Sequence, residues 1–199
     1  MMRRDLPLAL LALLFAADLA VPVALILHQG TGNWGETLSG LGARTGPYQQ
    51  VVSIWLVAFG AGLGFWALAQ RKSVAKGWIG LLIWAVGGGI VCGVFPEDAI
   101  RAAETLSGKL HGIGAGLGSV ALITVAPVQY RHLRSGWPRY VLIALIFVSA
   151  LGFCTFLAMG RDSDLIGHWQ RLYLTASYIA VLWAFGFARI QGPKSCATF

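Results

Sequence analysis

The sequence predicts an all-α fold: a polytopic membrane bundle of six transmembrane helices with both termini in the cytoplasm. Of the 199 residues, 57% are hydrophobic and only 12% are charged, and the mean hydropathy is +0.70. Soluble domains usually carry about 25% charged residues. The apolar residues also fall into long runs that short polar segments separate, as is typical of membrane-spanning helices.

The apolar runs predict six spans within a single domain, residues 1–199. Each run has about 20 residues, which lets a helix cross about 30 Å of hydrocarbon, whereas a lone strand would leave its backbone unpaired in lipid. In chain order the predicted spans are approximately 6–28, 50–69, 78–95, 110–130, 140–159 and 168–187. The first run resembles a secretory signal, but it continues past any plausible cleavage point, so we expect an uncleaved anchor.

The charged residues predict the orientation of the bundle. One set of basic residues lies in the N-terminus, in two turns and in the C-terminal tail, where Asp5 is the only acidic residue. The set consists of Arg3, Arg4, Arg71, Lys72, Lys76, Arg131, Arg134, Arg139, Arg189 and Lys194. The other loops are richer in carboxylates. Because basic loops stay in the cytoplasm, we expect both termini there. The net charge of +7 is spread over short clusters and forms no single patch, so we expect no nucleic-acid partner.

Glycine pairs at helical spacing predict close packing between the helices. Small residues four apart let two backbones approach in a membrane. The pairs are Gly60-x3-Gly64, Gly89-x3-Gly93, Gly112-x3-Gly116 and Gly114-x3-Gly118. They lack the spacing and the preceding strand of a dinucleotide-binding loop, which excludes that class of site.

Short motifs recur at the predicted outer ends of the spans. The first outer loop contains LSGLG, the third span ends in GVFPED, a G-x-x-H opens the fourth span at Gly108 to His111, and QRLY (Gln170 to Tyr173) lies near the start of the sixth. In this order the motifs resemble the membrane family catalogued as domain of unknown function 998. That resemblance covers nearly the whole chain and implies a prokaryotic six-span protein, but it supplies no reaction. The layout is also distantly similar to the Frag1/DRAM/Sfk1 proteins.

Polar residues gather at the outer side of the predicted bundle and form the candidate site. They are His28, Ser39, Asp98, His111, His168 and Arg171. One interpretation pairs Asp98 and His111 as base and orienter, with Arg171 binding an anionic headgroup. Another is a zinc or iron site built from the histidines and Asp98, with His168 among the catalytic residues. Haem ligation by His111 with His28 or His168 is a further alternative. In a purely structural alternative, the histidines cap helices or bond to loop carbonyls.

Helical spacing places some of these residues on common faces. His111, Ala115 and Ser119 share one face of the fourth span, which predicts a groove of small residues below the imidazole. In the sixth span, His168, Arg171, Thr175 and Tyr178 follow the same periodicity and should face the bundle.

Asp18 is the carboxylate deepest inside a predicted span. A charge at this depth costs about 2.5–3.5 kcal/mol on insertion scales, so we expect Asp18 to face inward. It either contributes to a binding site or proton pathway, or is protonated and bonded to a neighbouring backbone group or hydroxyl. No second buried charge accompanies it, which argues against a proton wire.

Two classes of function follow from these residues. The first is an enzyme or binder that acts on a lipid or isoprenoid-like amphiphile, with a polar site at the outer leaflet that includes Ser39, Asp18 and Arg171 as binding residues. The alternative is a non-catalytic accessory subunit of a larger membrane complex, with other membrane subunits as partners. A solute transporter is disfavoured because the chain shows no repeat and no pair of broken helices. The sequence identifies no cofactor.

Overall fold

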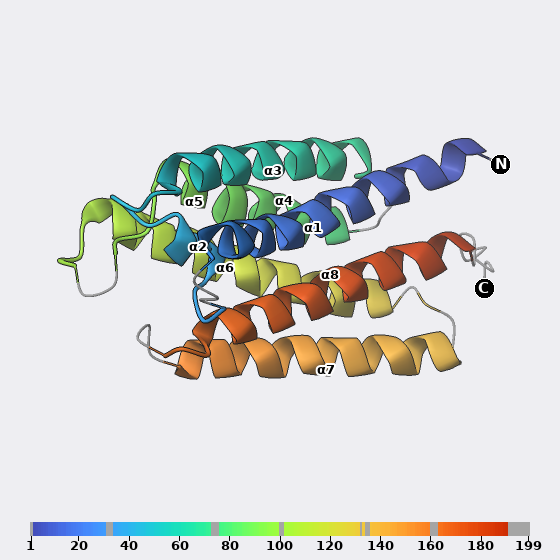
Figure 1. The fold of residues 1–199 in the computed structure, drawn as a ribbon. Coiled ribbons are helices and arrows are strands. Elements are labelled where there is room, and N and C mark those ends of the chain that lie inside the picture. Colours follow the sequence, from blue (N-terminus) through green and yellow to red (C-terminus); the bar gives the residue numbers. More distant parts are fainter. Residues whose placement is uncertain are drawn as a thin grey trace.

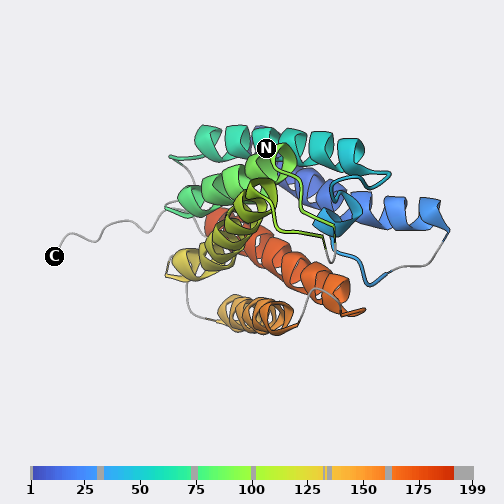
Figure 2. The same cartoon turned by 90° about the vertical axis from the view of Figure 1, so that its left-hand side faces the viewer.

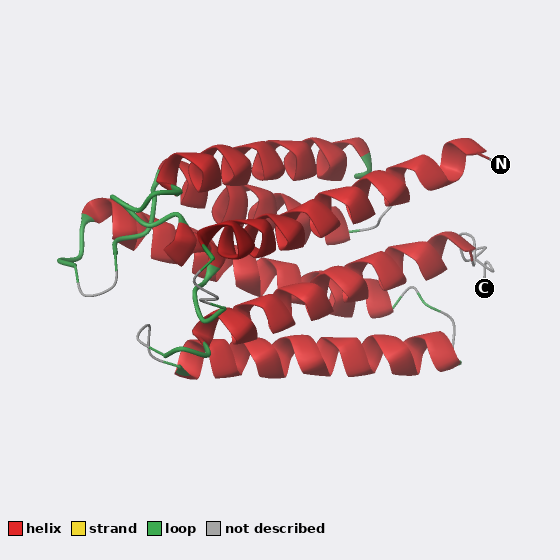
Figure 3. Cartoon of the chain, in the orientation of Figure 1, coloured by secondary structure: helices red, strands yellow, loops and turns green. Residues whose placement is uncertain are grey.

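The computed structural model describes residues 2–30, 34–72, 76–99, 102–131, 133, 136–159 and 163–190. Within these residues all regular secondary structure is helical (Figure 3). The helices are α1 (Met2–Gln29), α2 (Leu38–Leu41), α3 (Gln49–Ala69), α4 (Gly77–Trp84), the π-helical segment η1 (Ala85–Val91), α5 (Cys92–Val94), α6 (Leu106–Tyr130), α7 (Trp137–Ala158) and α8 (Ile166–Ile190). The segments α4, η1 and α5 follow one another without a break and form one long helix.

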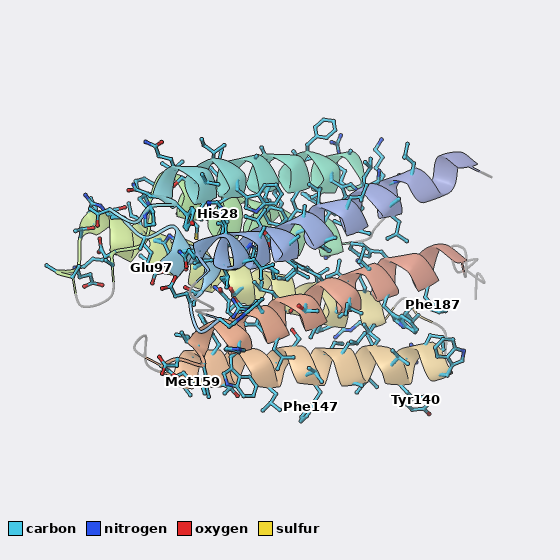
Figure 4. The ribbon with its side chains drawn as sticks, in the orientation of Figure 1. His28, Glu97, Tyr140, Phe147, Met159 and Phe187 are labelled. Carbon is cyan, nitrogen blue, oxygen red and sulfur yellow. The ribbon has the colours of Figure 1, made fainter. Side chains whose placement is uncertain are left out.

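The long helices lie side by side, and α1 begins at the same end of the bundle at which α8 ends (Figure 1). The opposite end carries α2 and the α5–α6 connection, and we call it the loop end. α7 packs mainly against α8 and, less extensively, against α6, so it lies at the edge of the bundle (Figure 2). Its outer face is apolar and exposed, with Tyr140 and Phe147 pointing away from the other helices (Figure 4).

Five of the long helical stretches have the length and apolar composition needed to cross a membrane. They are Leu6–Gln29, Gln49–Ala69, Gly77–Val94, Leu106–Tyr130 and Trp137–Ala158. These correspond to the first five predicted spans, which identifies a multi-pass membrane protein. α8, with 25 residues, is not among the five. The sixth span and the orientation therefore remain predictions.

The main hydrophobic core lies where α1, α3, α4, α6 and α8 meet. It is dominated by large buried side chains, among them Phe15, Phe59, Leu122 and Phe185. Aromatic rings link the helices across this core: Phe15 of α1 stacks on Tyr178 of α8 with ring centroids 4.0 Å apart. The core is thus formed mainly by side chains from helices that are distant in the sequence.

Several of the predicted glycine contacts are confirmed. A Cβ placed on Gly89 of η1 would lie 2.9 Å from the backbone nitrogen of Gly60 in α3, so these two helices touch through their backbones. In the same way, a Cβ on Gly114 of α6 would lie 2.9 Å from the carbonyl oxygen of Gly87. The Gly112-x3-Gly116 pair was wrongly predicted to pack, since no described atom lies within 4 Å of a Cβ at either position.

Two details at the loop end differ from the prediction. Residues 29–49 were expected to form a polar loop, but they include the short helix α2, whose Leu38 and Leu41 are buried. Thr37 caps this helix because its hydroxyl accepts a hydrogen bond from the Gly40 N–H at 2.9 Å. α6 begins at Leu106, four residues before the predicted span, because Thr105 caps it in the same manner.

Candidate functional site

The hairpin between α5 and α6 contains the predicted catalytic pair, and the structure gives Asp98 a structural position. The Asp98 carboxylate is buried and accepts two hydrogen bonds from Thr105, one from the backbone N–H at 2.7 Å and one from the hydroxyl at 2.8 Å. Arg44 lies 3.8 Å from the same carboxylate. A Cβ on Gly108 would collide with it, which explains the glycine of the G-x-x-H motif. Asp98 therefore secures the first turn of α6.

The His111 side chain also secures this hairpin. Its Nδ1 lies 2.9 Å from the carbonyl oxygen of Phe95, the residue that follows α5. Because a carbonyl only accepts, Nδ1 carries a proton, and in the neutral ring Nε2 is then the acceptor. The His111 carbonyl in turn accepts the Cys92 thiol at 3.7 Å. The imidazole thus joins the two ends of the hairpin while Nε2 keeps its lone pair.

Asp98 and His111 line different spaces. Asp98 lines a loop-end pocket of about 400 Å³, together with residues of the first outer loop and of the loop before α8. His111 lines a smaller space of about 40 Å³ inside the bundle, which we call the inner cavity. The structure therefore does not place these two residues across one pocket as base and orienter.

Replacing Asp98 with alanine is expected to lower the free energy of unfolding by about 1–3 kcal/mol, because the buried Thr105 N–H loses its acceptor. Thermal unfolding of the purified protein, followed by tryptophan fluorescence, measures this change. The matched control is Glu104→Ala on the same hairpin. Glu104 is exposed and its ion pair with Lys109 spans 3.7 Å at the surface, so that change should be below about 0.5 kcal/mol. Equal losses in the two variants would contradict the structural role of Asp98.

The inner cavity is lined by residues from every described helical element except α7. Its lining combines apolar and polar side chains: Asp18, Leu38, Ser39, Leu56, Phe59, Trp84, Gly88, Cys92, His111, Ala115, Ser119, Gln170, Tyr173 and Leu174. His111, Ala115 and Ser119 lie on one face of α6 in this wall, which confirms the predicted groove below the imidazole. Ser119 is bonded across the cavity wall to the hydroxyl of Tyr173 at 3.1 Å. Of the predicted candidates, this cavity brings together Asp18, Ser39 and His111.

Asp18 is buried at the centre of the bundle, with neutral hydrogen-bond donors on both oxygens. The Trp55 indole N–H donates to Oδ1 at 3.1 Å, and the Tyr178 hydroxyl donates to Oδ2 at 2.7 Å. The Trp84 indole N–H donates to the Tyr178 hydroxyl at 3.3 Å, which directs the tyrosine proton toward Asp18. An ionised carboxylate can accept both of these bonds and still has lone pairs left. α3, α4 and α8 all contribute to holding this carboxylate.

The glycines of η1 and α6 make room for the Trp84 ring. A Cβ on Gly88, one turn along the same helix, would collide with the indole, and a Cβ on Gly118 would lie 2.8 Å from it. The indole lies between these glycines and reaches Tyr178. The glycine-rich sequence after Trp84 therefore serves both helix packing and the hydrogen bonds at Asp18.

The QRLY motif holds the first outer loop against α8. Gln170 accepts the N–H of Leu38 at 2.9 Å, and Arg171 donates to the carbonyl oxygens of Glu36, at 3.0 Å, and of Trp34. These bonds position α2, whose Ser39 lines the inner cavity while Gly40 lines the loop-end pocket. α2 thus separates the two spaces. Arg171 was expected to bind an anionic headgroup, but its guanidinium binds backbone carbonyls and does not line the inner cavity.

The remaining predicted ligands do not join this cavity. The His28 side chain is exposed at the end of α1 and meets the ring of Tyr48, with centroids 6.2 Å apart. His168 is exposed at the start of α8 and lines neither space, contrary to the expectation that it faces the bundle. Among the described residues, no group of three or more His, Cys, Asp or Glu side chains could hold a metal ion. The geometry therefore does not assemble the metal site predicted from His28, His111, His168 and Asp98.

Sequence reasoning missed several residues of this site. Trp55 and Trp84 were assigned no role, although the Trp55 indole donates to Asp18 and the Trp84 indole donates to the Tyr178 hydroxyl beside it. Tyr173 was noted only as part of QRLY. The available signal was a buried aspartate in a chain with eight tryptophans and five tyrosines, since indole and phenol groups are the donors that apolar spans can offer. Nothing in the sequence shows which of them reach it.

Comparisons with known proteins agree with the architecture. The family model described as "Protein of unknown function (DUF998)" matches residues 7–189. Nothing matched among the curated proteins or among the solved structures. The likeness to the Frag1/DRAM/Sfk1 proteins remains a prediction. Because the match covers all of the described spans nearly in full, the chain belongs to the DUF998 family, whose function is unknown.

Proposed function

We propose that the chain binds the polar end of a membrane amphiphile, a lipid or isoprenoid-like molecule, in the inner cavity. The observation that carries this proposal is a cavity with polar groups on its wall in the middle of an apolar bundle. Asp18, His111 and Tyr173 face this space from three different helices. Polar side chains are costly inside a membrane, and those that line an internal cavity are by default candidates for a binding site.

The size of the cavity favours a small head group. Its volume is about 40 Å³. At about 10–15 Å³ for each water, this accommodates about three waters or a polar head group of the same total size. The wall is apolar where Leu56, Phe59 and Leu174 contribute. A molecule with a small polar end and a hydrocarbon chain is complementary to both parts of the wall.

A lateral route at α6 supports a ligand that comes from the membrane. His111 lines the inner cavity and also a pocket on the surface of the bundle, next to Gly112 and Ile113. Ile113 is 59% exposed, and Leu117 and Val120 continue the same apolar outer face of α6. The hydrocarbon chain would extend along this face, with His111 at the point of entry.

The orientation in the cell membrane is part of the proposal. Arg71 and Lys72 follow α3 and Arg131 follows α6, at the end of the bundle where α1 begins (Figure 1), whereas Glu97 lies at the loop end (Figure 4). By the positive-inside rule, six spans would place the termini in the cytoplasm and the loop end outside. The inner cavity then lies toward the outer leaflet.

Filling the cavity tests the proposal. Ala115→Leu places a larger side chain in the cavity wall, and Ala61→Leu makes the same change on an exposed position of α3. We expect protein purified without added lipid to retain an amphiphile, detected by native mass spectrometry, and Ala115→Leu to reduce its occupancy by about tenfold or more. That loss corresponds to at least about 1.4 kcal/mol of binding free energy. Ala61→Leu should retain it.

Two outcomes would contradict amphiphile binding. The wild-type protein could retain no amphiphile, or Ala115→Leu and Ala61→Leu could retain equal amounts while both stay folded. If the purified protein instead carried stoichiometric membrane proteins that neither variant displaced, the alternative of an accessory subunit in a larger complex would replace the proposal.

A further inference from the structure

We propose that the inner cavity takes a primary ammonium group, which pairs with Asp18. This inference rests on the proposed function, because it names the chemical class of the polar end that the cavity binds. It contrasts with the anionic headgroup that the sequence suggested. Three observations carry it: the neutral surroundings of Asp18, the absence of cations in the cavity wall, and the carboxylates of the adjacent loop-end pocket.

The surroundings of Asp18 offer an ionised carboxylate no counter-charge among the described residues. Its hydrogen-bond partners, Trp55 and Tyr178, are neutral donors, and no ion pair among the described residues involves Asp18. A carboxylate has about four lone-pair sites, so these donors leave room for a further one. An ammonium group in the cavity would supply both that hydrogen bond and the missing positive charge.

The other polar groups of the wall suit a donor. The Nε2 of His111 is an acceptor because Nδ1 donates to the Phe95 carbonyl at 2.9 Å. The hydroxyls of Ser39 and Ser119 accept as well as donate. No lysine or arginine lines the inner cavity within the described part of the chain. A phosphate or carboxylate head would therefore meet the charge of Asp18 with no cation to offset it, whereas a primary ammonium has three protons to donate.

The loop-end pocket adds an electrostatic bias in the same direction. Its lining contains Glu36, Glu97, Asp98 and Asp164 and includes no lysine or arginine among the described residues, although Arg44 lies next to Asp98. A hollow lined by one sign of charge concentrates ions of the opposite sign. Since α2 contributes residues to the lining of both spaces, cations are favoured on both sides of α2.

The test compares ligands that differ only in the polar end. The melting temperature of the protein in lipid nanodiscs is measured with dodecylamine, 1-dodecanol and dodecanoic acid at equal concentrations, and with ethylamine as a water-soluble amine. We expect dodecylamine to raise the melting temperature by about 5 °C and the other three by less than about 1 °C. Asp18→Asn should lose the response to dodecylamine.

A second variant guards against misfolding of Asp18→Asn. Ala115→Leu keeps Asp18 and fills the cavity, so it should also lose the response, whereas Ala61→Leu should keep it. Equal stabilisation by dodecanol and dodecylamine, blocked by Ala115→Leu, would overturn the ammonium assignment and leave the proposed function intact. Equal stabilisation by ethylamine and dodecylamine would overturn the membrane origin of the ligand and support the pairing with Asp18. A response to dodecylamine that survives in both Asp18→Asn and Ala115→Leu would overturn the assignment.

Discussion

Replacing Gly114 with leucine is expected to destabilise the bundle by about 3 kcal/mol or more, whereas the same substitution at Gly116 should change its stability by less than about 1 kcal/mol. The two positions lie two residues apart on α6. A Cβ on Gly114 would lie 2.7 Å from a methyl carbon of Val91 and 2.9 Å from the carbonyl oxygen of Gly87. At Gly116 no described atom lies within 4 Å. The same added volume therefore meets the neighbouring helix at one position and open space at the other.

The expected loss at Gly114 comes from backbone contact, which side-chain rotation cannot relieve. η1 and α6 would have to move apart, and this would separate Trp84 from Gly118 of α6, which lies against its ring. Size-exclusion chromatography and thermal unfolding in detergent report the change, with Gly116→Leu as the matched control. If Gly116→Leu were as damaging as Gly114→Leu, α6 would have to pack through its other face, and the lateral route proposed at Ile113 would be closed.

The glycines show how far the sequence could predict this fold. The helical period and the four-residue spacing of the glycines correctly predicted close packing on α6, and they placed His111, Ala115 and Ser119 on one face. They could not decide between the two overlapping glycine pairs of α6, because the choice depends on which face meets η1. That is a contact between helices, and a helical repeat contains no information about it. The result is that Gly114-x3-Gly118 packs while Gly112-x3-Gly116 does not.

The candidate site was predicted in part for a related reason. A polar residue inside an apolar span is a strong signal, and Asp18 does line the cavity with Ser39 and His111. Polar residues near the span ends are ambiguous, because they serve equally well as ligands and as caps. Asp98 caps the start of α6 through Thr105, and Arg171 binds loop carbonyls. Only the three-dimensional positions of Thr105 and of the first outer loop distinguish these roles.

Replacing Tyr178 with phenylalanine is expected to lower the free energy of unfolding by about 1.5–3 kcal/mol. The tyrosine hydroxyl donates to Asp18 at 2.7 Å and accepts from Trp84 at 3.3 Å, so its removal leaves one buried donor and one carboxylate oxygen without that partner. The stacking of the ring on Phe15 is retained in phenylalanine, which confines the change to the hydroxyl. Reversible unfolding in mixed micelles measures the difference.

A double-mutant cycle with Asp18→Asn separates the charge from the packing. If Asp18 is ionised, the hydroxyl of Tyr178 stabilises a buried charge, and Tyr178→Phe should cost at least about 1 kcal/mol less in the Asp18→Asn protein than in the wild type. A neutral aspartic acid would give nearly additive losses, because an amide accepts the same hydrogen bond. Trp183→Phe supplies the control, since its indole bonds to the Pro138 carbonyl at 3.0 Å, away from Asp18.

The coupling between Asp18 and Tyr178 also affects the expected response to dodecylamine. A charge that two neutral donors, Trp55 and Tyr178, stabilise only partly remains costly in a membrane, and a bound ammonium would reduce the cost. Tyr178→Phe should therefore increase the stabilisation that dodecylamine provides, because the ligand then replaces a missing donor. Loss of the dodecylamine response in Tyr178→Phe, with the fold retained, would instead mean that the hydroxyl positions the carboxylate for binding. Both results are compatible with an ionised Asp18, whereas additive losses together with no amine response would identify Asp18 as a neutral group of the core.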